Sequence, residues 1–357
     1  MVQANADEQI VVTSIEVKTP LAARLNVNAA ALRAGISAYA EFPDYYPLLA
    51  DEEADSYPAI AVFDPEIDEY GWKRLMHITE KAFLSFVGET GFDRKKYQQA
   101  AIWFALPYSD NAVQNLGIQQ HFLPHLIERF SMPSECEITG FQLGATGVGY
   151  LVNQARRALD CGRFKFVIIV AVDSYLLDGR ISMYDQQWRL KSDRNPTGFV
   201  PGEGIGIMLM ETASSAMQRT CTPLFQISGV GLSQEFNPIT SDKSSSGTGL
   251  SQAIEIALEA VIEQPVKYLF SDLNGESYRA FEWGVVSTRL AQYFDQKLEH
   301  IYPAEAFGEL GSVAMMMSLG CFSEALKGEY APDSNALIFV ASDSGQRAAL
   351  YVSQITT

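Results

Sequence analysis

The segment from Ile138 to Gly162, ITGFQLGATGVGYLVNQARRALDCG, has the features of a turn that holds a catalytic nucleophile. Small residues form a tight turn that opens directly into a helix, and the helix dipole favours negative charge at that end. The turn reads Leu-Gly-Ala-Thr-Gly and contains neither Cys nor Ser. The sequence therefore predicts the geometry of a nucleophile site without its nucleophile.

A pair of histidines has the spacing of metal ligands. His121 and His125 are four residues apart, and Glu128 follows three residues later. Such spacing can bind a metal on one helix face, but Pro124 lies between the two histidines and no second ligand cluster is evident. We therefore favour a helix surface or interface over a metal site, and we place His300 in a surface loop.

Three closely spaced glycines raise the question of a phosphate-binding loop. They lie in TGFVPGEGIGIMLMETA at Gly202, Gly204 and Gly206. A dinucleotide-binding fingerprint must open a helix, whereas these glycines run into the apolar, strand-like IGIMLMET. A bend between two strands is the better interpretation, and no nucleotide or other cofactor is expected.

The four cysteines form no CxxC pair, which argues against a zinc site and against a disulfide framework. They are Cys136, Cys161, Cys221 and Cys321. The chain has 357 residues and a formal net charge of -17, so nucleic acid and anionic membranes are unlikely partners. No apolar run is long enough to span a membrane and the N-terminus does not resemble a signal peptide, so the cytoplasm is the expected location.

Strand and helix patterns alternate along the chain, which predicts βαβ units and a mainly parallel sheet. The segments after Cys221 repeat the order seen before it: strand, helix, strand, turn, long helix, strand. Residues 41–70 are rich in Pro, Asp, Glu and Tyr and are expected to be irregular. The predicted strands are 9–17, 100–108, 136–142, 164–174, 224–233, 266–275 and 335–345, and the predicted helices are 26–35, 70–87, 111–130, 147–161, 248–261 and 310–326.

The order of five motifs resembles the β-ketoacyl synthases of the thiolase superfamily, over nearly the whole chain. The motifs are QIVVTSIEVKTPLAARLNVNAAALRAGIS, GFQLGATGVGYLVNQARRALDCGRFKFVIIVAVDS, GFVPGEGIGIMLMETASSA, SDLNGESY and AFGELGSVAMMMSL. This resemblance implies the thiolase fold: two similar α/β halves, residues 1–217 and 218–357, each with a mixed five-stranded sheet, in a five-layered αβαβα arrangement. It also implies a dimer joined through edge strands of the first halves, with KFVIIVAVD near that interface.

The resemblance places the catalytic positions of the family on residues that lack the family's reactive groups. Counting back from Gly162 puts the acyl-accepting Cys at Ala145, or at Gly144 if the turn shifts by one residue. The first of two histidines falls on Asn274 and the second on Gly308. The family's lysine falls near Pro303, and its glycine-rich pocket segment falls on residues 342–347, where it is not retained. Neither a nucleophile nor a general base remains.

Three hypotheses follow from the resemblance and these losses. The first is a catalytically inactive homologue that acts as a partner, scaffold or accessory protein, such as a chain-length-factor-like subunit or an accessory factor for secreted effectors. The second is an acyltransferase with relocated catalytic residues, and the third is a non-catalytic acyl-chain binder. We expect a homodimer or heterodimer. An acyl carrier protein is disfavoured by the acidic charge, since the only compact basic cluster is RLKSDR at Arg189–Arg194.

Overall fold

The computed structural model describes residues 9–42, 58–63, 69, 71–90, 99–108, 118–130, 135–177, 179–259 and 264–355. Most of the segment 41–70 therefore lies outside the described residues. Within the described residues, no helix is both long enough and apolar enough to cross a membrane.

The strands of the main sheet come in equal numbers from the two parts of the chain. The first part supplies β1 (Ile10–Lys18), β4 (Ala100–Leu106), β5 (Glu137–Gln142), β6 (Phe166–Ser174) and β7 (Glu203–Thr212). The second part supplies β8 (Phe225–Gln234), β9 (Val266–Ser271), β10 (Phe294–Ile301), β11 (Asn335–Ala341) and β12 (Gln346–Ser353). A separate small sheet pairs β2 (Ala40–Glu41) with β3 (Ala59–Ile60).

Helices connect these strands and cover the sheet. The longer ones are α1 (Leu25–Arg33), α2 (Trp72–Thr90), α6 (Gly147–Asp160), α9 (Thr248–Leu258), α10 (Ser277–Arg289) and α12 (Ala314–Lys327). The shorter ones are α5 (Leu123–Arg129), α7 (Arg180–Gln186), α8 (Ala213–Gln218) and α11 (Ala304–Phe307), with the π-helix η2 (Ile118–Phe122) and the 3-10 turns η3 (Gly144–Thr146), η4 (Ala291–Tyr293) and η5 (Gly311–Val313).

The two sets of five strands have the same topology. The strand order is β5-β4-β6-β7-β1 in the first set and β10-β9-β11-β12-β8 in the second. In each set the first two pairs are parallel and the last two are antiparallel. The internal repetition expected from the sequence pattern is therefore present in the strand order.

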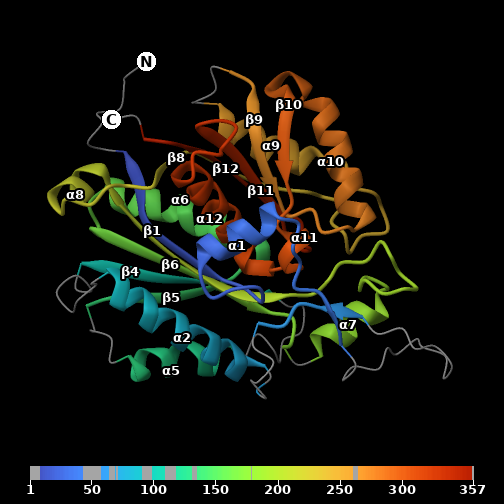
Figure 1. The fold of residues 1–357 in the computed structure, drawn as a ribbon, viewed down its shortest axis with the longest axis horizontal. Helices are drawn as coiled ribbons and strands as arrows, with labels where there is room; N and C mark the ends of the chain where they lie inside the picture. Colours follow the sequence, from blue (N-terminus) through green and yellow to red (C-terminus); the bar gives the residue numbers. More distant parts are fainter. Residues whose placement is uncertain are drawn as a thin grey trace.

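The two sets join at a short seam and fold over a shared pair of helices. Only two residue pairs, Val11 with Gln226 and Val12 with Phe225, connect β1 to β8. In Figure 1, α2 and α5 lie on the outer face of the first set, α6 and α12 lie between the sets, and α9 and α10 lie against the second set. This arrangement gives the five layers of the expected αβαβα fold.

Strands β6 and β11 are buried on both faces, because each lies between two hydrophobic cores. In β6, Phe166, Ile168, Val170 and Val172 face α2 and α5, whereas the alternate residues Val167, Ile169 and Ala171 face the central helices. Strand β11 alternates in the same way between the central core and the core under α9 and α10. A strand buried on both faces reads as a continuous apolar run, which is the pattern found in the sequence.

The glycines of the GFVPGEGIG segment serve close packing. A Cβ added at Gly202 would lie 2.6 Å from the carbonyl oxygen of Phe307, and one at Gly204 would lie 2.8 Å from that of Lys18. At Gly206 it would lie 2.2 Å from the Met316 side chain on α12. The segment leads into β7 and not into a helix, so the structure agrees with the rejection of a phosphate loop.

Several sequence expectations need correction. The main sheet is mixed and not mainly parallel, because four pairs of its described strands are parallel and five are antiparallel. Strand β6, which contains KFVIIVAVD, is an inner strand between β4 and β7, and β5 is the edge strand of the first set, so a place for β6 near a dimer interface stays a prediction. The helix expected to be interrupted at Pro124 does change there: the π-helix η2 ends at Phe122, and Pro124 lies in the first turn of α5, where proline is tolerated. Residue His300 lies in β10 and not in a loop.

Candidate functional site

The turn η3, which links β5 to α6, is pressed between strands of both sets. Gly144 has φ +56°, in the left-handed region that glycine adopts without strain. A Cβ added at Gly147 would lie 3.0 Å from Ala105 on β4, and one at Gly149 would lie 2.6 Å from a side chain on β12. Ala145, the expected nucleophile position, is only 7% exposed. Close packing therefore favours glycines at the start of α6, whatever the chemistry of the turn.

A hydroxyl of the second set lies opposite the turn. A Cβ built on Gly144 would be 3.6 Å from Ser342 Oγ, which follows β11. Ser342 Oγ lies 3.0 Å from Ser344 Oγ, and the Ser344 hydroxyl donates to Gln346. The Ser342 hydroxyl thus contacts another hydroxyl, and within the described residues no basic side chain forms a hydrogen bond with it that could activate it.

Asn274 lies in the turn between β9 and α10, where its amide is held by two carboxylates. Its Nδ2 donates to Glu309 Oε2 at 2.7 Å and to Glu276 Oε2 at 3.1 Å. Its Oδ1 accepts from the Glu276 backbone N–H at 3.1 Å. Each polar atom of the side chain is therefore already engaged within the protein.

Gly308 brings no side chain to this site, and its backbone leaves no space for one. Its φ is +72°, and an added Cβ would lie 2.7 Å from the carbonyl oxygen of Val200. The next residue, Glu309, supplies the side chain that meets Asn274. The sequence analysis missed Glu309, although it directly follows the glycine of the matching motif.

Glu309 is a buried carboxyl at the meeting point of the two sets. It is 4% exposed, and its Oε1 accepts from the Gly311 N–H at 3.0 Å. Its backbone N–H donates to Val200 and its carbonyl accepts from Gly202, so the glycine-rich segment is docked beside it. Burial raises the pKa of Glu309 to about 7. This carboxyl therefore exchanges its proton near neutral pH.

Two arginines cross-link the acidic residues around Asn274. Arg189 forms two hydrogen bonds with Glu276, the shorter 2.7 Å, and contacts Asp343 at 2.7 Å. Arg279 contacts Asp272 at 2.7 Å and Asp343 at 3.3 Å. Burial by itself would raise the pKa of Asp343, but Arg189 and Arg279 lower it to about 2. Arg189, the first residue of the RLKSDR cluster, is thus directed inward.

Asp173 connects the turn η5 of the second part of the chain to the first set of strands. It follows the apolar run of β6, is fully buried, and contacts Arg180 Nη1 through Oδ1 at 2.5 Å. Its Oδ2 accepts from the Ser312 backbone N–H in η5 at 2.8 Å. A Cβ on Gly311 would lie 2.2 Å from the same oxygen. The carboxylate therefore occupies the space where a side chain of the second turn would otherwise lie.

The glutamate of the GFVPGEG motif is structural. Glu203 accepts two hydrogen bonds from Arg74 of α2, at 2.7 and 2.6 Å, and one from Ser174 Oγ at 2.6 Å. It also accepts from the Phe63 backbone N–H. These contacts attach α2 and the segment around residue 63 to β7.

The histidines proposed as possible metal ligands contact neighbouring side chains. His121 stacks on Trp72, with ring centroids 5.2 Å apart, and His125 Nε2 lies 3.6 Å from Glu80 of α2. No group of three or more His, Cys, Asp or Glu residues that could hold a metal occurs in the part of the chain that the structure describes. His121 and His125 therefore belong to the interface between α2 and the η2–α5 segment.

The cysteines do not lie at the expected nucleophile position. All four are free. Cys136 and Cys321 are buried, and burial raises the pKa of each thiol to about 12, so both are protonated at neutral pH. Cys161 is exposed at the far end of α6 from the turn.

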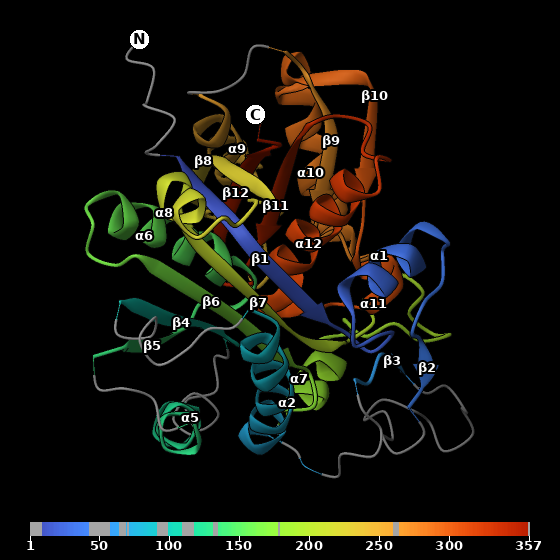
Figure 2. The same ribbon diagram turned by 60° about the vertical axis from the view of Figure 1, so that its left-hand side comes forward.

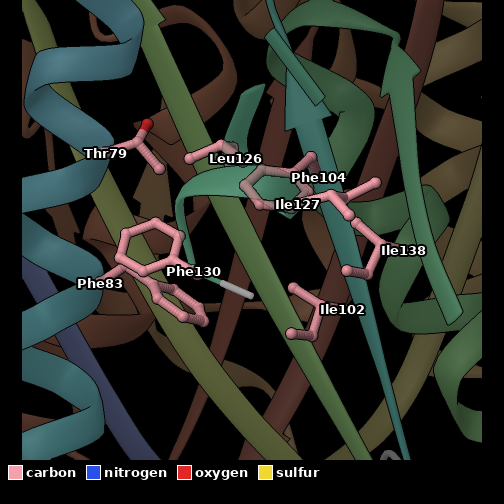
Figure 3. Close-up of a pocket in the computed structure, with 8 residues that line it drawn as sticks. All are labelled: Thr79, Phe83, Ile102, Phe104, Leu126, Ile127, Phe130 and Ile138. Atoms are coloured by element: carbon pink, nitrogen blue, oxygen red, sulfur yellow. The ribbon is translucent and has the colours of Figure 1, made fainter. Parts of the chain in front are cut away.

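A small cavity beneath α2 and α5 has the character of a packing gap. Its volume is about 10 Å³. Figure 3 shows seven apolar side chains around it together with Thr79, whose hydroxyl donates to the Leu75 carbonyl at 2.7 Å. A void this small barely holds one water molecule. Its lining residues are Thr79, Phe83, Ile102, Phe104, Leu126, Ile127, Phe130 and Ile138.

Comparisons with known proteins relate the whole chain to ketosynthases through structure. No family model matches the sequence. A 73-residue segment is 37% identical to a 3-oxoacyl-[acyl-carrier-protein] synthase homologue of Saccharomyces cerevisiae, and that match covers 20% of this chain and 16% of the yeast protein.

Three solved structures superpose over 97–98% of the chain and 99–100% of their own chains. One is a type II PKS acyl-carrier protein in complex with its ketosynthase, with TM-score 0.80 and 12% identity. The others are the ishigamide ketosynthase/chain length factor, with TM-score 0.76 and 14% identity, and a β-ketoacyl synthase from Burkholderia phymatum, with TM-score 0.75 and 13% identity. The chain therefore has the thiolase fold of the ketosynthases.

Proposed function

We propose that this protein is a catalytically inactive relative of the β-ketoacyl synthases that acts as a partner, scaffold or accessory subunit. The observation that carries the proposal is the turn at η3, which presents the methyl group of Ala145 where the resemblance expects a thiol. Asn274, which the resemblance places at the family's first histidine, already donates to Glu276 and to Glu309. A methyl group cannot hold an acyl chain, and an amide that is already fully bonded is a poor donor to a developing oxyanion.

Structural likeness to the ishigamide ketosynthase/chain length factor supports a subunit role. In this proposal the chain serves as a chain-length-factor-like subunit of a synthase or as an accessory factor for secreted effectors. In both roles the protein binds another protein, and no reaction at the turn is needed. Fold alone does not define function, so the proposal rests on the residues of the site.

Strand β5 is the natural place for a partner. It pairs only with β4 in the described sheet, and its residues are half-buried. An unpaired edge exposes backbone donors and acceptors that a second chain can satisfy. We therefore propose a dimer through β5, formed with a second copy or with a synthase-like protein, in the cytoplasm.

An acyl carrier protein is a less favoured partner because of charge. One similar structure is a carrier protein in complex with its ketosynthase. The net charge of this chain is -17, and Arg189 of its basic cluster is engaged by Glu276 and Asp343. Repulsion between acidic proteins slows encounter, so another protein is the favoured partner.

A direct test is the intact mass of the purified protein after incubation with acyl-CoA and with an acylated carrier protein. We expect no mass increase, because the turn has no thiol and its one hydroxyl, that of Thr146, is buried and donates to the Leu143 carbonyl at 3.1 Å. A stable acyl adduct on any residue would favour a relocated acyltransferase. Light scattering at micromolar concentration tests the dimer, and a monomeric mass for the protein alone would leave only the heterodimer.

Glu309 is the observation that favours the second candidate function, an acyltransferase with relocated residues. A buried carboxyl with a pKa of about 7 is suited to proton transfer. If the wild-type protein showed thioester hydrolysis or acyl transfer, the Glu309→Gln variant would lose it under this second hypothesis. Activity that survives this substitution would assign the reaction to other residues.

A further inference from the structure

A cavity of about 280 Å³ lies outside the two turns, between α1 and the outer strands of the second set. In Figure 2, α1 and α11 lie next to each other, with α12 and β10 close by. The walls come from α1, α12, β9 and β10, and from the segments following α12 and β10. The volume is just below the range of about 300–1,000 Å³ that is usual for small-molecule pockets, which suits a ligand the size of one amino acid.

The inner wall of this cavity is aromatic and uncharged. Tyr268 and Phe270 of β9 and Cys321 of α12 are buried there. Burial raises the pKa of the Cys321 thiol to about 12, so it carries no charge at neutral pH. Burial lowers the pKa of His300 to about 4, and its two ring nitrogens contact Ser271 at 2.8 Å and Tyr302 at 3.1 Å. His300 therefore adds an uncharged ring.

The rim of the cavity carries charges of both signs. The Arg33 guanidinium carbon lies 3.8 Å from the centre of the Tyr330 ring, and this stacking leaves the guanidinium edge available. Glu299 and Glu305 supply two carboxylates on the same lining. Within the described residues, none of the three forms a side-chain ion pair. Both Arg33 and Glu299 influence the pKa of Tyr268, after the dominant effect of burial, so both charges lie within reach of the inner wall.

We propose that this cavity binds a small zwitterion of the α-amino acid type with an apolar or aromatic side chain. The Arg33 guanidinium would bind the carboxylate of the ligand, and Glu299 and Glu305 would bind its ammonium group. The side chain would lie against Tyr268 and Phe270. A purely anionic ligand would face two carboxylates, and a purely cationic ligand would face Arg33, whereas a zwitterion complements all three charges.

Isothermal titration of the full chain with L-phenylalanine, L-tryptophan and L-leucine tests the proposal. Two analogues of phenylalanine are matched probes: 3-phenylpropanoate lacks the ammonium group and 2-phenylethylamine lacks the carboxylate. We expect one-site binding of at least one amino acid at millimolar or lower concentration. For phenylalanine, we expect each analogue to bind about tenfold more weakly, because each leaves one side of the charged rim unpaired.

Substitutions on the rim assign the contacts. Arg33→Gln should weaken amino acid binding about tenfold without weakening the binding of 2-phenylethylamine. The double variant Glu299→Gln/Glu305→Gln should also weaken amino acid binding about tenfold, without weakening the binding of 3-phenylpropanoate. Arg24→Gln, at the start of α1, is the matched control and should bind as the wild type does. The three rim side chains are exposed, and thermal melts verify that the variants fold.

Three results would overturn the proposal. The first is failure of all three amino acids to bind at millimolar concentration. The second is unchanged amino acid affinity in the Arg33→Gln variant. The third is an analogue that binds as tightly as phenylalanine itself, because the charged rim would then have no role in recognition.

Discussion

The turns η3 and η5 occupy corresponding places in the two halves, and their surroundings differ sharply. Each is a three-residue 3-10 turn that begins with a glycine in the left-handed region and leads into a buried helix of 14 residues. Around η3 the atoms nearest to a Cβ on Gly144 are the Cβ of Tyr108 and the hydroxyl of Ser342. Around η5 they are the carboxylates of Asp173 and Glu309.

This difference separates what the fold requires from what a reaction requires. The backbone of both turns is fixed by close packing of α6 and α12 against strands of both sets. At η3 that packing is satisfied by a methyl group at Ala145. At η5 it is supplemented by buried acids that hold the turn in place. If Ala145 holds the nucleophile position, as we propose, close packing is sufficient to retain the turn without a reactive side chain.

The largest effect should come from removing the charge that fixes η5. Asp173→Asn leaves Arg180 buried at 4% exposure without its counter-ion, and an uncompensated buried charge costs about 3–5 kcal/mol. Urea unfolding measures this loss. Asp193→Asn, at an exposed position, is the control and should change stability by no more than about 0.5 kcal/mol. A loss of similar size in both variants would show that the Asp173–Arg180 pair has no special role.

Matched glycine substitutions compare the two turns directly. Gly144→Ala and Gly311→Ala both place a Cβ at positive φ, which costs about 1–2 kcal/mol. At Gly311 the Cβ would also lie 2.2 Å from Asp173 Oδ2, whereas at Gly144 the nearest atom is a side-chain carbon of Tyr108 at 3.3 Å. We expect Gly311→Ala to lose at least about 1 kcal/mol more than Gly144→Ala in denaturant unfolding. Equal losses of unfolding free energy in the two variants would show that the close approach of Asp173 to Gly311 adds no cost.

A smaller effect concerns the pH dependence of stability. Burial raises the pKa of Glu309 to about 7, above about 4.3 in an unfolded chain. The folded state therefore retains a proton that the unfolded state releases. The contribution of this carboxyl to the free energy of unfolding is fully present below about pH 4.3 and is lost as the pH rises to about 7.

The Glu309→Gln variant, which mimics the protonated acid, isolates this effect. Relative to it, the wild type should lose up to about 1.4 kcal/mol of unfolding free energy per pH unit within that window. Urea unfolding at a series of pH values measures the difference. The exposed Glu255→Gln variant should show no such trend. A flat difference between wild type and Glu309→Gln would contradict a raised pKa at this site.

Elements with strong periodicity could be predicted from the sequence, and polar edge elements could not. Helix α6 follows from the apolar stripe at Val148, Leu151, Val152 and Ala155, and its end follows from Gly162, which has φ +70°. Strand β10 was missed because FDQKLEHI is a half-exposed edge strand without clear alternation. Helix α10 was also missed, since it mixes polar and apolar residues without a clear period. Strand β12 was missed too, although it is buried and lies between β11 and β8.

The environment of the candidate site was harder to predict than its backbone. The resemblance pointed to Asn274 because its turn keeps the glycine at the next position, and the structure shows that Asn274 contacts Glu309. It did not identify Glu309, because a one-residue shift in register moves the side chain from one position to the next. The contact of Arg189 with Asp343 joins residues 154 positions apart, so no local pattern reveals it.

We propose that the absence of a thiol at Ala145 is not the only obstacle to condensation. Ala145→Cys restores a sulfur at the start of α6, where the helix dipole lowers a thiol pKa. Condensation also needs donors for the enolate oxygen, yet Asn274 is already bonded and Gly308 has no side chain. Loss of one such donor alone costs about 10²–10³ in rate in a well-studied enzyme.

The most direct measurement is therefore the turnover of malonyl thioester by the Ala145→Cys variant. A triple variant with Asn274→His and Glu309→His is the control for restored site chemistry, since Glu309 and not Gly308 has space for a side chain directed at Asn274. We predict that the single variant reacts with a thiol reagent or takes an acyl group but does not condense malonyl thioester. Turnover by the single variant at a rate typical of an enzyme would contradict this account, because the protein would then be a synthase disabled at one residue.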